Sequence, residues 1–368
     1  MTKRMITRLT ALLLTLLFLP AFSLAEDDLT IETETEQAPA ALVTDTGYSL
    51  DAEGFLTGEN PGPEYVLEDE ENGVWQYASA TLSVIIHRYQ EKVKKKTNLY
   101  VIAEIRTREK NPMDAIMTEA GKYKNPGTRQ DSPEKLLEKQ PAVLAVSDDM
   151  YGLRIMPVSG GKTKYDYHGV VIRYGEVMAT KTRKSPEEGK KDKRPWPNLD
   201  TMAVYPDGSL KAYVSDAKTA EEYLAEGAIH VFAFGPWLIS EGELNPALLN
   251  EKYYPSSDSR IAMGMVEPRH YVIVAGTARP NNKYTGVKLR FLAEKLQEYG
   301  CTEALNLDGG ATLYMSFMGK MIIQGDLSNK KKTRNIGSMI VWGLRNQETD
   351  QPPEETGEEE PEEAYEEE

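Results

Sequence analysis

The sequence predicts an α+β protein with a mixed β-sheet core, a few packed helices and a single large domain. Short runs of β-branched and aromatic residues recur between turns rich in Gly, Pro and Asp, as in sheet proteins. Few segments have helical periodicity, and a strand, a helix and a strand follow one another in the last third. With 368 residues, the chain is long enough to bury a large core.

The first half of this domain is expected to consist mainly of strands. Residues 77–89 and 99–106 are rich in β-branched and aromatic side chains, and the polar segment between them favours an antiparallel pair. Ser132 followed by Pro133 is typical of a helix start. The apolar run at residues 142–146 predicts a buried strand that ends at acidic residues.

The second half shows the most regular order of elements. Residues 202–205 and 210–214 flank a Pro-Asp-Gly turn, which predicts a hairpin. A helix is expected to end at Gly300, and residues 304–307 then form a strand, so a right-handed crossover is predicted. The apolar residues on one face of this helix are Leu289, Leu292, Ala293 and Leu296.

Residues 1–25 predict a secretory signal peptide. Three basic residues precede or begin an apolar stretch that extends to Phe22, and Ser23-Leu24-Ala25 supplies small residues suited to signal peptidase. Because the stretch is short for a membrane span and contains a proline, cleavage is favoured over a retained N-terminal anchor. We therefore expect a secreted or extracytoplasmic protein associated with the cell envelope.

Two polar flanks are expected beside the folded part. Residues 26–74 are acidic and contain many Gly and Pro, which predicts a linker, and residues 346–368 predict a disordered acidic tail. The formal net charge is −15, and residues 26–36 and 348–368 hold 6 and 12 acids without a base. The domain itself is expected at residues 75–345. Without these two flanks and the basic N-terminal segment, the middle of the chain, residues 37–347, has no net charge, which argues against a nucleic-acid partner.

The cysteine and histidine content excludes two kinds of site. Cys301 is the single cysteine, so no disulfide forms within the chain, and its apolar setting predicts a buried thiol. The histidines are far apart in sequence, which argues against a conventional zinc site. No cofactor is expected, and a divalent cation held by carboxylates stays open. The histidines are His87, His168, His230 and His270.

The most informative stretch reads A-L-N-L-D-G-G-A-T, at residues 304–312. Its apolar run predicts a buried strand, and Gly309 and Gly310 permit backbone angles that other residues resist. Asp308 is thereby placed at a strand end, where folds built on sheets often present chemistry. The alternative is a turn aspartate that hydrogen-bonds its own backbone.

Further acids and arginines follow other predicted strands. They are Asp149, Arg173, Arg260 and Arg279. Each one alone is compatible with a surface ion pair or a turn. Together with Asp308 they predict a site in which guanidinium groups bind an anion and carboxylates perform acid–base chemistry.

Five blocks between residues 75 and 343 occur in a recognisable order. They are AVSDDMYG, GVVIRYGEV, FAFGPWLISEGEL, SRIAMGM and the segment TGVKLRFLAEKLQEYGCTEALNLDGGATLYMSFMGKMI. In order and spacing they resemble the phosphodiester glycosidase family, which includes the lysosomal enzyme that uncovers mannose 6-phosphate and exported bacterial proteins linked to exopolysaccharide. The resemblance implies a hydrolase that cleaves the bond between an α-linked sugar, N-acetylglucosamine in the best-known case, and a bridging phosphate.

The resemblance also implies roles for the candidate residues. Asp308 becomes the leading catalytic carboxylate and Asp149 its partner, because breaking an anomeric bond requires carboxylates. Arg260 and Arg279 bind the phosphate, and Asn306 orients the sugar or the carboxylate. The remaining members of the implied substrate-binding set are Gly309, Gly310 and Arg173.

Three departures from the family pattern lead to an alternative function. An aspartate is missing beside Gly276, where family members commonly read V-D-G-R, and Ser147-Asp148 replaces Asn-Gly. Ala311 and Thr312 replace a glycine and a serine, and alanine resists positive φ, so a different loop is expected. The alternative is a non-catalytic surface protein that binds phosphorylated or acidic glycans.

Overall fold

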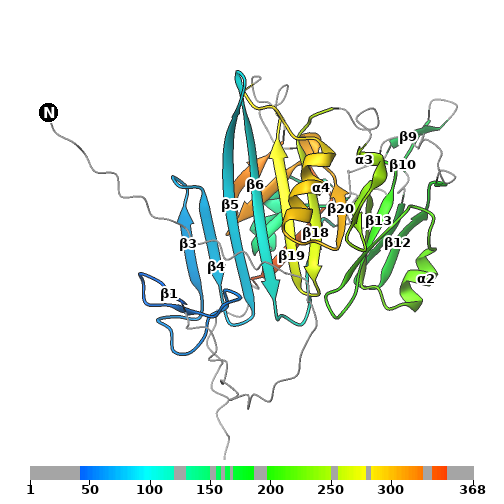
Figure 1. Cartoon of the computed structure of the whole chain (residues 1–368). Helices are drawn as coiled ribbons and strands as arrows, with labels where there is room; N and C mark the ends of the chain where they lie inside the picture. The colour runs from blue at the N-terminus through cyan, green and yellow to red at the C-terminus, as the bar shows by residue number, and fades with distance from the viewer. Residues whose placement is uncertain are drawn as a thin grey trace, which may run out of the picture. The chain divides into compact units, whose positions relative to one another are not determined.

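Strands make up most of the protein, and four helices accompany them in the described part of the chain (Figure 1). The computed structural model describes residues 42–119, 130–149, 155–158, 162–165, 169–185, 197–249, 256–278, 283–325 and 334–345. These residues all belong to one compact unit, Pro39–Glu368. The predicted sheet-dominated core is confirmed, whereas the predicted signal peptide and acidic tail lie outside the described residues.

The largest sheet has nine strands, and neighbouring strands pair antiparallel. Its long central strands begin or end where the candidate residues lie. In order across the sheet they are β17 (Glu243–Leu244), β16 (Trp237–Ser240), β20 (Glu303–Leu307), β18 (Arg260–Glu267), β19 (His270–Thr277), β6 (Lys96–Thr107), β5 (Leu82–Val93), β4 (Val74–Ala78) and β3 (Tyr65–Asp69).

Two five-stranded antiparallel sheets supply the other strands near the candidate site. One has the order β12 (Glu176–Lys181), β11 (Gly169–Arg173), β15 (His230–Phe234), β13 (Asp200–Val204) and β14 (Leu210–Tyr213). The other has the order β22 (Lys320–Gln324), β21 (Tyr314–Phe317), β8 (Ala142–Ser147), β23 (Ser338–Leu344) and β7 (Asp114–Met117). Two short ribbons pair β1 (Leu42–Val43) with β2 (Ser49–Leu50), and β9 (Ile155–Val158) with β10 (Lys162–Tyr165).

The predicted crossover occurs between β19 and β20. Both strands pair antiparallel with β18, which lies between them, so β19 and β20 run parallel to each other. The connecting helix α4 (Leu289–Glu298) covers one face of the large sheet (Figure 1). Its predicted apolar stripe is fully buried there, as the exposed fractions of Leu289, Leu292, Ala293 and Leu296 are 0–1%.

Both faces of the large sheet are covered by apolar side chains. On β6, Tyr100 and Ile102 pack in the cluster that includes the buried side of α4. The alternate residues Val101, Ala103 and Ile105 point to the opposite face and join a larger core shared with β8, β13 and β23. Because the strands are buried on both faces, polar chemistry is restricted to their ends.

The remaining helices are short and begin at recognisable caps. Ser132 accepts a hydrogen bond from the Lys135 N–H at 3.4 Å, as predicted for a helix start. Thr219 and Glu222 form a reciprocal capping box. Within the described residues, no helix is both long and apolar enough to cross a bilayer. These helices are α1 (Pro133–Lys139), α2 (Ala220–Ala225) and α3 (Pro246–Leu249).

Ordered structure begins earlier than the sequence predicts. The predicted linker, residues 26–74, contains β1, β2 and β3 from Leu42 onward. Leu50 and Phe55 are only 2% and 1% exposed, and the guanidinium carbon of Arg108 lies 3.8 Å from the centre of the Phe55 ring. The segment therefore buries its few apolar residues against the domain. Its acidic composition alone does not indicate this burial.

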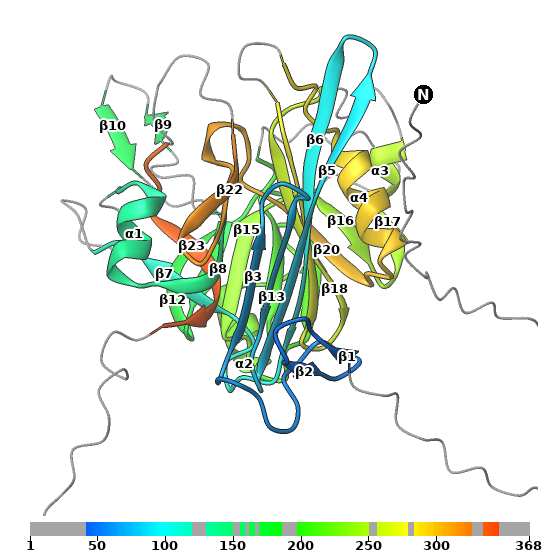
Figure 2. The same ribbon diagram turned by 90° about the vertical axis from the view of Figure 1, so that its left-hand side faces the viewer.

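The strand predicted at residues 77–89 is divided into β4 and β5. Between them, the hydroxyl oxygen of Ser79 accepts hydrogen bonds from the N–H groups of Thr81 and Leu82, which forms a tight turn. β5 and β6 then pair along their full length, so the predicted antiparallel pair is confirmed. The tip of this hairpin extends past the neighbouring strands (Figure 2).

Candidate functional site

The ends of β8 and β20 meet through hydrogen bonds between segments distant in sequence. The N–H of Asp308 donates to the carbonyl oxygen of Asp148 at 2.8 Å. The hydroxyl of Ser147 donates to the carbonyl oxygen of Asp308 at 3.2 Å and accepts from the N–H of Tyr314. The acids predicted at two strand ends are therefore brought together.

The carboxylate of Asp149 is directed into the protein. One of its oxygens forms an ion pair with Arg173, and the other accepts a hydrogen bond from the N–H of Ala233. The guanidinium of Arg173 also donates to the carbonyl oxygens of Ile172 and Val231, at 3.0 and 2.7 Å. Asp149 and Arg173 are 0% and 1% exposed, so both side chains of this ion pair are shielded from bulk solvent.

Asp148 extends the buried ion pair. Its carboxylate lies 3.5 Å from the guanidinium nitrogen of Arg173 and accepts a hydrogen bond from the hydroxyl of Ser338, at the start of β23. The guanidinium carbon of Arg173 also lies 4.1 Å from the centre of the Phe232 ring. Two carboxylates thus share one guanidinium in a site walled by an aromatic ring.

A second set of polar groups lies beside Arg173, which is the register partner of His230 in the pairing of β11 with β15. Burial, and then the charge of Arg173, lowers the pKa of His230 to about 3, so this imidazole is neutral. The hydroxyl of Tyr174 donates to Asp114 at 3.1 Å, and burial raises the pKa of this tyrosine to about 12. Burial also raises the pKa of Asp114. No local sequence pattern indicates this set, because Tyr174 lies in the turn after β11 and its partners His230 and Asp114 come from two other strands.

The loop after Asp308 lies against the start of β18. The N–H of Gly310 donates to the carbonyl oxygen of Ser259 at 2.7 Å. Gly310 has a φ of +59°, and it begins a 3₁₀ turn that includes Ala311. Ala311 is not among the described residues with positive φ. The strain predicted for Ala311 is therefore not present, because Gly310 adopts the left-handed conformation instead.

Asn306 lies near the end of β20, two residues before Asp308. Its amide nitrogen donates to the carbonyl oxygen of Gly235 at 2.8 Å. Its side-chain oxygen is buried and has no hydrogen-bond partner among the described residues. An acceptor is therefore available beside the candidate carboxylate.

Of the two predicted phosphate-binding arginines, Arg260 is described and Arg279 lies outside the described residues. Arg260 begins β18 opposite Gly276 of β19 and is 8% exposed. Its guanidinium donates to the carbonyl and hydroxyl oxygens of Ser256, at 3.1 and 3.3 Å. These contacts hold the Arg260 side chain at the end of the sheet where Asp308 lies.

Two other predictions concern metals and the single thiol. In the described ranges, no group of three or more His, Cys, Asp and Glu side chains is arranged to hold a metal ion. Cys301 is buried, as predicted, and burial raises the pKa of its thiol to about 12. This thiol is therefore protonated at neutral pH and packs as an apolar group.

Known proteins resemble the chain in sequence and in fold. The family model described as phosphodiester glycosidase matches residues 154–342. The fold is similar to that of the zebrafish N-acetylglucosamine-1-phosphodiester alpha-N-acetylglucosaminidase catalytic domain auto-inhibited by pro-peptide, with a TM-score of 0.52. That similarity covers 77% of this chain and 88% of the zebrafish chain, at 13% identity.

A relative in sequence is the SPbeta prophage-derived uncharacterized protein YomE of Bacillus subtilis (strain 168). The two chains are 25% identical over 154 residues, which is 40% of this chain. The match spans only 23% of the length of YomE.

Proposed function

The chain belongs to the phosphodiester glycosidase family, and from this premise we propose that it hydrolyses the glycosidic bond of a sugar 1-phosphodiester. The substrate class corresponds to the activity in the name of the structurally similar zebrafish enzyme. The observation that carries the proposal is the hydrogen-bonded junction of β8 and β20, which places Asp308 beside the buried Asp148 and the start of β18.

We assign Asp308 as the catalytic carboxylate. It lies at a strand end, its main chain is fixed by hydrogen bonds on both sides, and its side chain is 6% exposed. In the proposed reaction, water attacks the anomeric carbon and the bond from this carbon to the phosphate oxygen breaks. The sugar retains the new hydroxyl group, and the proton released by water is transferred to the phosphate product. Asp308 would activate the water or stabilise the oxocarbenium-like centre.

Arg260, Arg279 and Asn306 are proposed to bind the substrate. Arginine side chains suit a phosphodiester because their planar fork donates two hydrogen bonds and their charge stabilises the leaving group. The side-chain oxygen of Asn306, which has no hydrogen-bond partner among the described residues, suits a sugar hydroxyl. Gly309 and Gly310 allow the loop to approach the ligand closely.

For Asp149 and Arg173 the contacts support a positioning role. Both oxygens of Asp149 are engaged inside the protein, and Arg173 is bound to two main-chain carbonyl oxygens. We propose that this ion pair fixes the end of β8, whose main chain in turn receives the N–H of Asp308. Its effect on catalysis would be exerted through Asp308.

We further propose that the substrate is an envelope or extracellular glycan. This part of the proposal rests on the N-terminal segment, in which basic residues, an apolar stretch and a small-residue cleavage sequence occur in the order of a signal peptide.

The decisive experiment measures release of free sugar from a UDP-sugar and from a synthetic sugar phosphodiester. The unaltered chain should release sugar, and Asp308→Asn should reduce kcat by at least about 100-fold while the folded structure is retained. Asp207→Asn is a suitable control, since Asp207 lies in the turn between β13 and β14, and its carboxylate accepts hydrogen bonds from the N–H and the hydroxyl of Ser209. Equal rates for the unaltered chain and Asp308→Asn would overturn the assignment.

A second candidate function is binding of phosphorylated or acidic glycans without hydrolysis. It is favoured by the missing acid beside Gly276 and by the buried state of Asp149, which leave Asp308 as the candidate acid for direct contact. Saturable glycan binding without sugar release from any of these substrates would support this function instead.

A further inference from the structure

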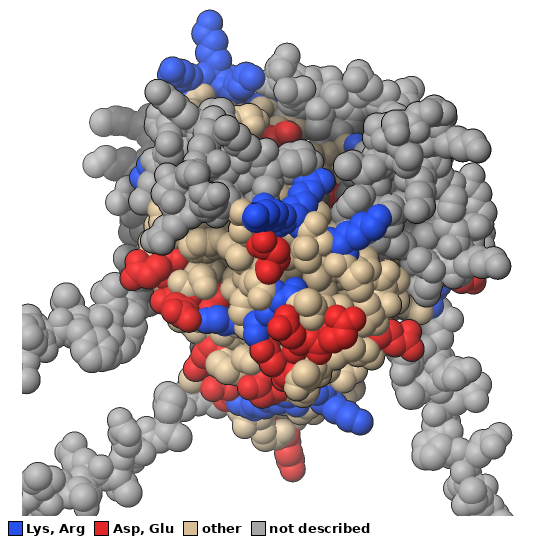
Figure 3. Space-filling model, turned by 90° about the vertical axis from the view of Figure 1, so that its right-hand side faces the viewer, with Lys and Arg blue, Asp and Glu red and all other residues tan. Residues whose placement is uncertain are grey.

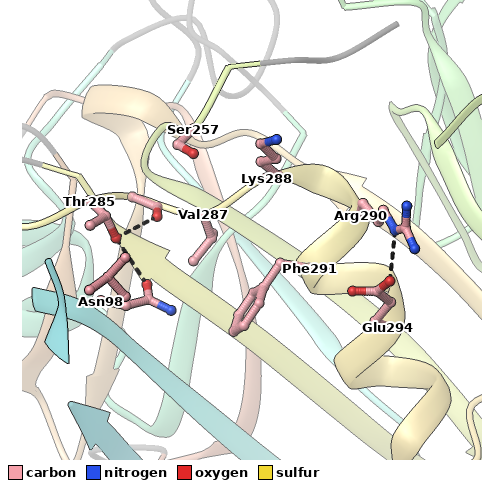
Figure 4. Close-up of a pocket in the computed structure, with 10 residues that line it drawn as sticks. Asn98, Ser257, Thr285, Val287, Lys288, Arg290, Phe291 and Glu294 are labelled. Carbon is pink, nitrogen blue, oxygen red and sulfur yellow. Dashed lines mark hydrogen bonds and ion pairs between the residues drawn. The ribbon is translucent and has the colours of Figure 1, made fainter. Parts of the chain in front are cut away.

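A pocket of about 300 Å³ opens between the start of α4 and the residues next to the tip of the β5–β6 hairpin (Figure 4). None of its lining residues belongs to the candidate catalytic or substrate-binding set. The residues used below are Asn98, Ser257, Thr285, Lys288, Arg290 and Phe291. The volume lies at the lower end for small-molecule sites, which fits one ring-sized group.

Asn98 directs a hydrogen-bond donor into this pocket. Its side-chain oxygen lies 3.3 Å from the hydroxyl of Thr285, which also lies 2.9 Å from the carbonyl oxygen of Gly286. The amide nitrogen lies on the side of Phe291 (Figure 4), and among the described residues it has no hydrogen-bond partner. Asn98 is only 8% exposed and lines the pocket, so little of its side chain is open to a ligand from any other side.

Phe291 supplies an apolar wall beside this donor. Its ring packs edge-on against Tyr100, with a distance of 5.0 Å between the ring centres and an angle of 77°. The residue remains half-buried, so part of the ring lines the pocket. An aromatic ring next to amide and hydroxyl groups is suited to a ligand with one apolar face and polar edges, such as a sugar ring.

The start of α4 adds an attraction for negative charge. This ten-residue helix begins after Lys288, whose side chain forms no capping hydrogen bond, so the first N–H groups lack a side-chain acceptor. The helix dipole favours an anion at this end. Lys288 is exposed and has no ion pair in the described part of the chain. The nearby acid Glu294 is paired with Arg290 at 2.7 Å.

Lysines of the hairpin extend this positive region. Lys92, Lys94, Lys95 and Lys96 are exposed at the tip, and within the described residues they form no ion pair. Next to the tip, two hydrogen bonds join Thr97 to the segment before α4. The Thr97 N–H donates to the Lys283 carbonyl oxygen at 3.1 Å, and the Thr285 N–H donates to the Thr97 carbonyl oxygen at 2.9 Å. Lysine or arginine side chains gather at the top of the molecule in Figure 3, at the height of the hairpin tip in Figures 1 and 2.

We propose that the pocket and the hairpin lysines bind a polyanionic glycan, with one acidic sugar residue in the pocket. The sugar ring would lie against Phe291 and accept a hydrogen bond from Asn98, and its carboxylate or phosphate would lie at the start of α4 near Lys288. The adjoining anionic residues would contact the lysines. The surface in Figure 3 carries acidic groups below this region, unlike the continuous basic stripe of nucleic-acid-binding proteins.

This inference concerns binding and does not require hydrolysis. Calorimetry with the full chain would measure the Kd of a short oligogalacturonate, which carries carboxylates, and of an oligomer of sugar phosphodiesters. A neutral cellulose oligomer and a short oligothymidylate serve as comparison ligands. Lys288→Gln should weaken binding of the anionic glycan by about tenfold, since a hydrogen bond to a charged group contributes about 1.5–3 kcal/mol.

Asn98→Asp keeps the shape of the side chain and replaces the donor by a charge that repels the ligand, so it should also weaken binding by at least about tenfold. The matched control is Lys139→Gln, an exposed lysine on α1. Circular dichroism of each variant verifies folding, and high salt should weaken binding by the unaltered chain.

The proposal is supported if either anionic glycan binds the unaltered chain and Lys139→Gln but binds neither pocket variant. Which of the two glycans binds then shows whether the pocket takes a carboxylate or a phosphate. The proposal is overturned if neither anionic glycan binds, if Lys288→Gln binds as tightly as the unaltered chain, or if oligothymidylate binds equally well. A chain that binds the glycan in this way but releases no sugar would overturn only the proposed hydrolysis.

Discussion

Replacing Gly309 by alanine tests whether the Asp308 loop must lie directly against β18. A Cβ atom at Gly309 would lie 2.5 Å from the carbonyl oxygen of Ser259 and 3.0 Å from the Cα atom of Arg260. Both are main-chain atoms, so no side-chain rotation can relieve the overlap. The φ of Gly309 is −111°, outside the left-handed region that favours glycine, and the overlap with the main chain of β18 is the effect that this variant tests.

The expected magnitude follows from this overlap. Inserting a methyl group into a packed region costs about 1–3 kcal/mol, and alanine recovers about 0.4–1 kcal/mol by restricting the unfolded chain. A net loss of about 1–2 kcal/mol corresponds to a decrease in Tm of roughly 2–6 °C for a domain of this size. Displacing Asp308 from Arg260 by about 1 Å should also lower kcat/KM for a sugar phosphodiester by about 100-fold.

The neighbouring glycine is a matched control. A Cβ atom at Gly310 would meet no atom within 4 Å, but the φ of this residue is +59°. Gly310→Ala should therefore cost about 1–2 kcal/mol through backbone strain alone, and Gly310→Asn should cost less because asparagine tolerates this conformation. Thermal unfolding by circular dichroism and sugar release would be measured for each variant. A Gly309→Ala variant with unchanged Tm and unchanged rate would refute the close-approach argument.

Three further predictions concern buried groups. Arg173→Met deprives the buried Asp149 of its guanidinium, so the free energy of unfolding in urea should fall by about 3–5 kcal/mol, and an unchanged value would contradict the ion pair. The pKa of His230 is about 3, below its ordinary value of 6.5, so its contribution to stability is complete above pH 6.5 and is lost as the pH falls toward 3. His230→Phe should make stability less dependent on pH in this range, and an identical profile would exclude that role. Cys301 should react with a disulfide reagent only as fast as the chain opens, whereas rapid labelling of the folded chain would contradict its burial.

The sequence was sufficient to predict the strand ends that form the candidate site. Apolar runs at residues 142–146 and 304–307 are recognisable because buried strands are apolar on both faces, and the acids after them mark where burial ends. Their junction could not be predicted, because Ser147 and Asp308 are 161 residues apart and their contact depends on how three sheets pack. Local patterns carry no information on such pairing.

The same limit explains why the surroundings of Asp149 could not be predicted. In sequence, Asp149 and Asp308 are equivalent acids at strand ends. In the structure, Asp149 is fully buried because Arg173, on another sheet, and the N–H of Ala233 bind both of its oxygens. The environment that separates a positioning acid from a candidate catalytic acid is supplied by distant strands.

The segment from Ser256 to Arg260 connects the two proposed sites. Ser257 lines the pocket, whereas the carbonyl oxygen of Ser259 binds the N–H of Gly310. Between them, the main chain of Asp258 exchanges hydrogen bonds with Val287, just before α4, at 3.1 and 2.9 Å. Because main-chain hydrogen bonds fix this segment on both sides, a ligand in the pocket and the loop of Asp308 contact the same rigid element. Substitutions within the segment should therefore affect both sites together, whereas Lys288 and Asp308, on opposite sides of it, allow binding and hydrolysis to be tested separately.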